Sequence, residues 1–345
     1  MTRRYTIVAA LLLVALGLAA LAQEQRAEET IVVQRVVVDA HILSAGGEPL
    51  EGITPADLEA FVDDLPATVE AVEWVAEDED QPEPPKRTFE DSGPRVTVLA
   101  DSQRGRRIVL FFQTDFQRER IKGHMRMTIH AKEFIRTLEP EDLVAVVSYD
   151  SKLKLWQDFT SDVESLDTAI DRTKEIAEVS WRDLGLYPSL AAALDENEAG
   201  DAATVEMGLR RIGEALQDVD GRKTLVFFGY GIGVYAGKGV ISYPGYAQAR
   251  LALETARTSV FVFDVSDADW HTLESGLEMI AEDTGGFYVK THQFARSAVK
   301  KLHRAISGHY EIVLVKPTEH RGDHAVRINV KIRGARVHTR KIFRD

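Results

Sequence analysis

Short apolar runs separated by helical segments constrain this 345-residue chain more than any other feature of its sequence. Each run is continuously apolar, which is typical of a strand that is covered on both faces. The runs are Arg107–Phe112, Leu143–Tyr149, Thr224–Phe228, Val260–Phe263 and Phe287–Val289. Strands that alternate with helices predict one parallel sheet with helices on both faces and right-handed crossovers.

The intervals between these runs carry the predicted helices. They are Met125–Leu138, Val163–Ala177, 188–195, 202–218, 245–257, 272–283 and Phe294–Ile306, and Leu153–Phe159 is predicted to be an edge strand. The fold class is therefore α/β, with a Rossmann-like, doubly wound and mostly parallel sheet over residues 105–307.

Two β-rich segments flank this α/β region, at residues 30–75 and 308–345. Predicted strands are Ile31–Leu43, Leu58–Val62, Ala67–Val75, His309–Val315, Ala325–Ile332 and Arg336–Phe343. Neither segment has enough strands to be stable by itself, so we expect the two to pair into one small sandwich-like domain. Residues 76–104 link the first segment to the α/β region, and their first part is acidic, proline-rich and poor in large apolar residues.

Residues 1–22 have the pattern of a secretory signal peptide. Arg3 and Arg4 precede the apolar run Ile7–Leu21, and Ala20-Leu21-Ala22 is a cleavage site of the small-residue type. The alternative is an uncleaved membrane anchor, for which the apolar run is short. We therefore expect an exported protein, periplasmic or secreted, whose fold does not depend on disulfides because the chain has no cysteine.

Three segments in order resemble the bacterial family of VWFA-related acidobacterial proteins, which carry a von Willebrand factor A-type domain. They are GITPADLEAFVDDLPATVEAVE at 52–73, LWQDFTSDVESL at 155–166, and AEDTGGFYVKTHQFARSAVKKLHRAISGHYEIVLVKP at 281–317. The resemblance covers nearly the whole chain after the signal segment. It implies a doubly wound domain that binds protein partners.

The resemblance also implies a divalent metal site, and this sequence departs from it at each ligand position. Such domains bind the ion through D-x-S-x-S after the first strand, a later Thr and a later Asp, since Mg²⁺ prefers oxygen ligands. Here Gln113 stands at the first Asp, Asp115 and Gln117 at the two Ser, Leu184 at the Thr and Tyr230 at the second Asp. We expect no metal cofactor, although a slipped register leaves Asp115, Gln117 and Glu119 as an alternative set of ligands for Mg²⁺ or Mn²⁺.

The carboxyl ends of the strands remain the expected binding face, because ligands of open α/β sheets bind there. Aromatic residues and arginine supply much of the binding energy in protein interfaces. The candidates are Asp115, Gln117, Tyr149, Asp150, Trp181, Arg182, Tyr187, Tyr230, Tyr235, Tyr243, Asp264, Asp267 and Trp270. The alternative for each one is that it only caps its own loop.

The sequence favours a non-catalytic binding or scaffold protein over an enzyme. It has no G-x-S-x-G elbow and no cysteine nucleophile, and the glycine-rich stretch Gly229–Gly233 is not a phosphate-binding loop. The histidines at 309, 320 and 324 are expected to lie on the surface, with a metal site as the alternative. A net charge of −13 argues against nucleic acid as a partner. The remaining alternatives are metal-dependent adhesion through the slipped ligand set and an envelope hydrolase.

Overall fold

The apolar runs form the central strands of a six-stranded sheet. A computed structural model describes residues 34–76, 105–114, 118–181, 183, 185, 187–237, 240–241 and 245–344. Every residue of β4 (Arg107–Gln113) is buried, and its side chains alternate between the two faces of the sheet. Leu110 and Phe112 pack on one face, and Val109 and Phe111 pack on the other.

The order of the strands confirms the predicted doubly wound, mostly parallel sheet. From edge to edge it is β11 (Tyr288–Lys290), β10 (Thr258–Asp264), β7 (Lys223–Gly229), β4, β5 (Leu143–Tyr149) and β6 (Leu153–Thr160). All neighbours are parallel except β6, which runs antiparallel to β5 at the edge. The chain order reverses between β4 and β7, and the carboxyl ends of two such strands are where ligands bind in open α/β sheets.

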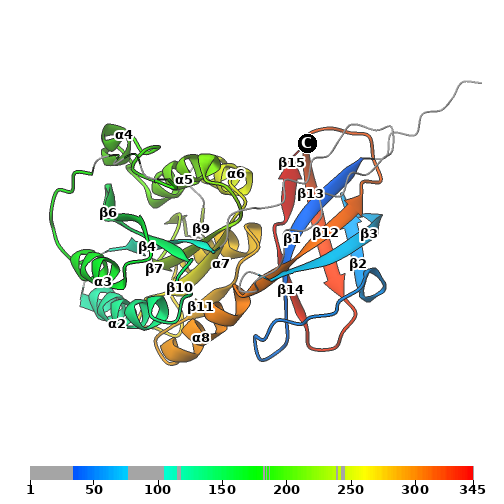
Figure 1. The fold of residues 1–345 in the computed structure, drawn as a ribbon, viewed down its shortest axis with the longest axis horizontal. Helices are drawn as coiled ribbons and strands as arrows, with labels where there is room; N and C mark the ends of the chain where they lie inside the picture. Colours follow the sequence, from blue (N-terminus) through cyan, green and yellow to red (C-terminus); the bar gives the residue numbers. More distant parts are fainter. Residues whose placement is uncertain are drawn as a thin grey trace, which may run out of the picture. The chain divides into compact units, whose positions relative to one another are not determined.

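Helices cover both faces of this sheet (Figure 1). One face packs against α2 (Arg118–Ile135), α3 (Val163–Arg172) and α8 (Ala295–Ala305). The other packs against α4 (Glu196–Gly200), α5 (Val205–Ala215), α6 (Tyr246–Thr255) and α7 (Glu274–Asp283), and η2 (Leu216–Asp218) follows α5.

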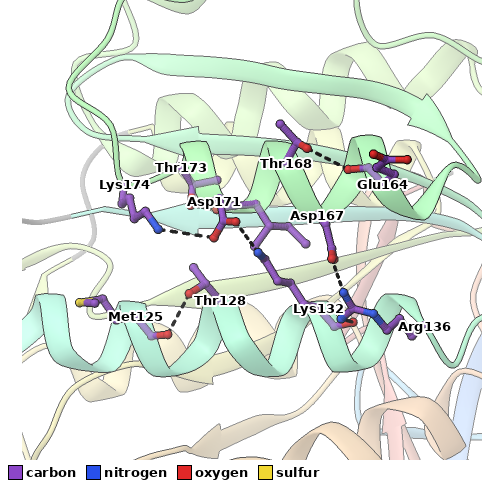
Figure 2. A network of polar contacts seen from close by, with 11 residues as sticks. Met125, Thr128, Lys132, Arg136, Glu164, Asp167, Thr168, Asp171, Thr173 and Lys174 are labelled. Atoms are coloured by element: carbon purple, nitrogen blue, oxygen red, sulfur yellow. Dashed lines mark hydrogen bonds and ion pairs between the residues drawn. The ribbon is translucent and has the colours of Figure 1, made fainter.

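Figure 2 shows α2 and α3 side by side, joined by polar contacts at their surface. Arg136 pairs with Asp167, and the Asp171 carboxylate lies between Lys132 and Lys174. Exposed pairs of this kind contribute less than about 1 kcal/mol each. The buried apolar face of α3 therefore contributes more to its docking than these ion pairs do.

Strands from both flanking segments alternate in one antiparallel sheet of seven strands. Its order is β14 (Arg336–Thr339), β1 (Arg35–Leu43), β12 (Gly308–Val315), β3 (Leu65–Ala76), β2 (Leu58–Val62), β13 (Asp323–Val330) and β15 (Ile342–Arg344). The short η1 (Pro55–Asp57) precedes β2, with Thr54 at its N-cap. One face of the sheet encloses a core that β1, β2, β12 and β13 share. The two flanking segments thus pair with each other as predicted, but they form a single curled sheet and not a sandwich-like domain.

Three predicted elements differ in the structure, and one further element was not predicted. Residues 188–195 form turns, and the short α4 follows them. The helix that begins at Val163 ends at Arg172, and the last predicted strand is divided into β14 and β15. A small hairpin of β8 (Val234–Tyr235) and β9 (Val240–Ile241) follows β7 and was not predicted. For the helix from Val163 and for the last strand, the type of element was predicted correctly and only its extent differs.

The described residues after Gln34 belong to one compact unit. No helix among them is both long enough and apolar enough to cross a membrane. The predicted signal segment 1–22 lies outside the described residues, as does the linker except for Ala76 at its start.

Candidate functional site

A glutamine binds the loop after β7 at the edge of the sheet where the strand order reverses. Gln113 ends β4, and its side chain is buried. Its Oε1 accepts hydrogen bonds from the backbone N–H groups of Tyr230 (3.0 Å) and Gly231 (3.3 Å), and its Nε2 donates to the Gly231 carbonyl (2.9 Å). Both ends of the amide are thus used by the loop after β7. The residue at the first metal-ligand position holds a loop and leaves no anionic oxygen there.

A second polar cluster ties the loop after β10 to the neighbouring strand. The side chain of Asp264 is buried, and its Oδ2 lies 2.8 Å from Nε2 of His271 and accepts a hydrogen bond from the Tyr288 hydroxyl at 2.7 Å. Its Oδ1 accepts from the backbone N–H of Ser266 at 2.8 Å. Burial by itself would raise the pKa of Asp264, but the hydrogen bonds from His271 and Tyr288 lower it below its usual value. Asp264 is therefore a buried carboxylate that positions the loop of residues 265–273.

Helix α2 lies directly against this edge. Gly123 packs on the backbone after β10, where an added Cβ would come 1.6 Å from the Val265 carbonyl oxygen. Only glycine permits so close an approach. The approach brings the Arg120 guanidinium 4.0 Å from the centre of the Tyr230 ring, and Arg126 forms an ion pair of 3.3 Å with Asp267. The predicted residues Tyr230, Asp264 and Asp267 therefore lie at the same edge.

Two further predicted residues lie at the end of β5. The Tyr149 side chain is buried, and its carbonyl accepts a hydrogen bond from the Thr114 N–H at 2.8 Å. Asp150 pairs with Lys154 at 2.7 Å across the β5–β6 turn. Both side chains contribute to packing or to a turn, so neither presents a free polar group to a ligand.

The structure does not bring Tyr187 to this edge. Its hydroxyl accepts a hydrogen bond from the Asp220 N–H (3.0 Å) and donates to the Asp218 carbonyl (3.3 Å), just before β7 begins. Trp181 packs against the core, and its Nε1 donates to the Leu194 carbonyl at 3.4 Å. Both aromatic side chains therefore form hydrogen bonds that stabilise the loop after α3, and neither lies at the binding edge.

The remaining candidate residues of the binding face and the metal site lie outside the described residues, or their side chains do. Asp115, Gln117, Arg182, Leu184 and Tyr243 are outside the described residues. Glu119 lies within α2, but its side chain is also outside them. The slipped ligand set therefore stays an alternative prediction.

Exposed apolar side chains gather in the three loops that follow β7, β10 and β11. Trp270 and Phe294 are each 70% exposed, well above what large aromatic side chains usually retain. The five side chains, called the edge surface below, are Val234, Tyr235, Ile241, Trp270 and Phe294. Because β7, β10 and β11 are parallel, their following loops share one edge of the sheet.

One acidic residue at this edge was missed in the sequence. Glu206 in the first turn of α5 is fully buried, and its Oε1 accepts a hydrogen bond from the Gly233 N–H at 2.8 Å. Its Oε2 has no hydrogen-bond partner among the described residues. An acidic side chain in a first helical turn is so common that its position in the sequence carries no signal of burial.

The expectation that the histidines of the C-terminal segment lie on the surface is wrong for two of them. His309 and His324 are buried. His324 is on the face of β13 that contributes to the core of the antiparallel sheet, whereas His309 is on the opposite face of β12, beside His41. His309 lies with Asp39 and Glu311 in a group whose ligand atoms are within 4.8 Å of one another. However, Nη2 of Arg257 already lies 3.1 Å from Asp39 and 2.9 Å from Glu311. An arginine therefore supplies the positive charge that these carboxylates need.

Replacement of Gln113 tests its role as a loop anchor. Gln113→Leu is expected to lower the free energy of unfolding by about 2 kcal/mol, because two N–H groups and one carbonyl lose their buried partner. Urea unfolding at neutral pH measures this loss. Gln157→Leu is the control, because the Gln157 amide makes one bond with its neighbour's carbonyl and should cost less than about 1 kcal/mol. Equal losses in the two variants would show that Gln113 does not anchor the loop.

Comparison with known proteins adds similarity to solved structures. No protein-family model matches the sequence, and no curated protein matches it. PTMP1 from the mussel byssus aligns with a TM-score of 0.40 and 13% identity over 59% of this chain and 48% of that chain. BatB from Bacteroides thetaiotaomicron aligns with a TM-score of 0.39 and 12% identity, over 58% of this chain and 98% of that chain.

The vWF domain of the type V pili tip protein Mfa5 from Porphyromonas gingivalis aligns with a TM-score of 0.39 and 10% identity, over 59% of this chain and 96% of that domain. This chain spans about half the length of the mussel protein. The narrower bacterial family stays a prediction. Residues 105–307 have the doubly wound sheet that their resemblance in sequence to von Willebrand factor A-type domains predicts.

Proposed function

We propose that this chain is an exported, non-catalytic protein that binds a protein partner through the edge surface, without a metal ion at the usual position. The observation that carries the proposal is the exposure of five large apolar side chains in three loops at one edge of the sheet. Exposed aromatic side chains at one site are typical of protein interfaces, where a few such residues supply most of the binding energy.

The anchoring of the loops supports the proposal. Gln113 holds the loop after β7, and Asp264 holds the loop after β10. Loops that are fixed by buried hydrogen bonds lose little conformational entropy on binding, which favours affinity. The apolar side chains Tyr235 and Trp270 are therefore presented from a positioned backbone.

The Gln113 amide also favours binding without a metal ion. A neutral side chain with both ends bonded to backbone offers no charge to a hard cation, which prefers anionic oxygen ligands. Metal-dependent adhesion would therefore need the alternative set Asp115, Gln117 and Glu119. A hydrolase is the weaker alternative, since the hydroxyls that contact the His271–Asp264 pair in the described part of the chain bond the aspartate and not the histidine: Tyr288 donates to its carboxylate and Thr291 to its carbonyl.

Site-specific photo-crosslinking tests the edge surface directly. A benzoyl-phenylalanine at position 235 or 270 is expected to crosslink the same protein in intact cells of the source organism. The controls are positions 129 and 176, whose isoleucines are 61% and 84% exposed and lie elsewhere on the fold. Once the partner is identified, Trp270→Ala is expected to weaken its binding by about thirtyfold, as loss of a central aromatic residue does.

The outcomes separate the alternatives. Crosslinks that persist in EDTA support binding without a metal ion. Loss of the crosslinks in EDTA and recovery with Mg²⁺ would favour metal-dependent adhesion. Equal crosslinking at the control positions would refute a defined binding face.

A further inference from the structure

A basic pocket lies apart from the residues that anchor the sheet edge. Its volume is about 400 Å³, within the range of pockets that hold small ligands. It is bounded by the turn after β1, by α8, by the end of β11 and by β14. Six basic side chains line it and no acidic side chain does: Lys290, Lys300, Lys301, Arg304, Arg336 and His338. A cluster of basic residues is unexpected in a chain whose net charge is −13.

Only part of this positive charge is neutralised within the protein. Lys290 pairs with Glu274 at 2.6 Å, and Arg304 pairs with Glu48. Lys300, Lys301 and Arg336 form no ion pair with a carboxylate of the described residues. Three cations therefore share one pocket without a counter-charge from the described part of the chain.

The position of Lys301 is fixed by its surroundings. Its Nζ lies 4.0 Å from the centre of the Phe287 ring, and its aliphatic stem lies against Gly47. Gly47 has a φ of +81°, and an added Cβ would come 2.8 Å from Cγ of Lys301. Glycine at this turn lets the stem approach closely, so the turn contributes to the placement of the ammonium group.

The charges in the pocket disfavour one another. Burial and the neighbouring Arg336 lower the pKa of Lys301. Burial and the neighbouring Lys301 lower the pKa of His338 to about 4, and Arg336 acts in the same direction. His338 is thus neutral at pH 7, and its Nε2 has no hydrogen-bond partner among the described residues. An anion would relieve the repulsion between the cations.

We propose that this pocket binds a small, multiply charged oxyanion through Lys300, Lys301 and Arg336. The arginine suits both phosphate and carboxylate groups because its planar fork matches two oxygens, and the lysines add point charges. The pocket is about the size of a compact ligand with three charged groups. Phe294 of the edge surface also lines the pocket, but Lys300, Lys301 and Arg336 do not belong to the edge surface, so their variants test the anion site separately from the partner surface.

Titration calorimetry on the full chain at low ionic strength tests this site with two probes, sodium tripolyphosphate and sodium citrate. At least one probe is expected to bind with a stoichiometry of one. The double variant Lys301→Gln, Arg336→Gln should weaken binding by at least roughly tenfold, since each lost charge-assisted bond is worth more than about 1.4 kcal/mol. Binding of tripolyphosphate alone would identify a phosphate site, and binding of citrate alone would identify a carboxylate site.

The matched control removes the same charge elsewhere. Lys122 and Arg333 are exposed and do not line the pocket, so Lys122→Gln, Arg333→Gln should change the affinity by less than about threefold. Lys300→Gln is a second test that does not depend on a buried residue. Lys300 is exposed, so this variant should fold normally and still weaken binding several-fold. The proposal is overturned if neither probe binds, or if the pocket and control variants lose affinity equally.

Discussion

Asp142→Ala is expected to lower the free energy of unfolding by about 3–5 kcal/mol, because it leaves a buried guanidinium without its counter-charge. The side chains of Arg106 and Asp142 are 4% and 2% exposed. Asp142 Oδ1 accepts from the backbone N–H of Arg106 at 2.8 Å and from its Nε at 2.9 Å, and Oδ2 accepts from the Glu139 N–H at 2.9 Å. The pair joins the start of β4 to the start of β5. Urea unfolding monitored by circular dichroism measures the loss.

A pair of the same geometry at the surface supplies the control. Arg35 also holds a carboxylate with two nitrogens, at 2.6 and 2.9 Å from Glu70, but these side chains are 51% and 39% exposed. Glu70→Ala should therefore cost less than about 1 kcal/mol. The double variant Arg106→Met, Asp142→Leu should cost less than Asp142→Ala, because no buried charge is left unpaired. A similar loss in Glu70→Ala and Asp142→Ala would contradict this account of burial.

Asp264→Asn is expected to lower the free energy of unfolding by about 2–4 kcal/mol at pH 7, because the amide keeps a single acceptor oxygen for three donors. The effect should depend on pH. The folded pKa of Asp264 is lowered, so its contribution is complete above the unfolded pKa of about 3.9 and is lost as the pH falls through the folded pKa. The difference between the wild type and Asp264→Asn should therefore shrink below about pH 4.

Asp267→Asn is the control within the same loop. Its carboxylate is 41% exposed and makes one ion pair of 3.3 Å, so the variant should cost less than about 1 kcal/mol. Limited proteolysis gives a second readout, because Asp264→Asn should speed cleavage in the loop of residues 265–273 and Asp267→Asn should not. A stability difference for Asp264→Asn that stays constant from pH 7 to pH 3 would show that the carboxylate is not the group that holds this loop.

The sequence was sufficient to predict the strands of the six-stranded sheet and most helices of the α/β region. The strands of the parallel sheet are buried on both faces, so runs such as Ile108–Phe112 and Val260–Phe263 stay apolar throughout and stand out in the sequence. Residues 188–195 were predicted as a helix and form turns instead. A short apolar stretch between polar residues fits a buried turn as well as a helix, because both can bury residues four apart, here Leu190 and Leu194.

The candidate site could be predicted only in part. The position of Gln113 after the first strand was evident from the sequence, because the metal motif has a fixed spacing. The bonds from Gln113 to the backbone of Tyr230 and Gly231 were not, since they span more than a hundred residues. Tyr187 was predicted to lie at this edge and does not, again because its contacts are with residues distant in the sequence. The path of the long loop places its hydroxyl beside residues just before β7.

The sequence by itself determined the strands of the six-stranded sheet and most of the helices, because these depend on local periodicity. Through the family resemblance it also predicts changed metal-ligand positions, because that prediction depends on residue identity. Tertiary structure alone decided how β1 pairs with β12, although their partners Asp39 and Glu311 lie far apart in the chain. It also brought Gly47, Lys301 and Arg336 to one pocket. The physical reason is that such contacts depend on the packing of distant segments around a shared core, and no local repeat in the sequence records which distant segment that will be.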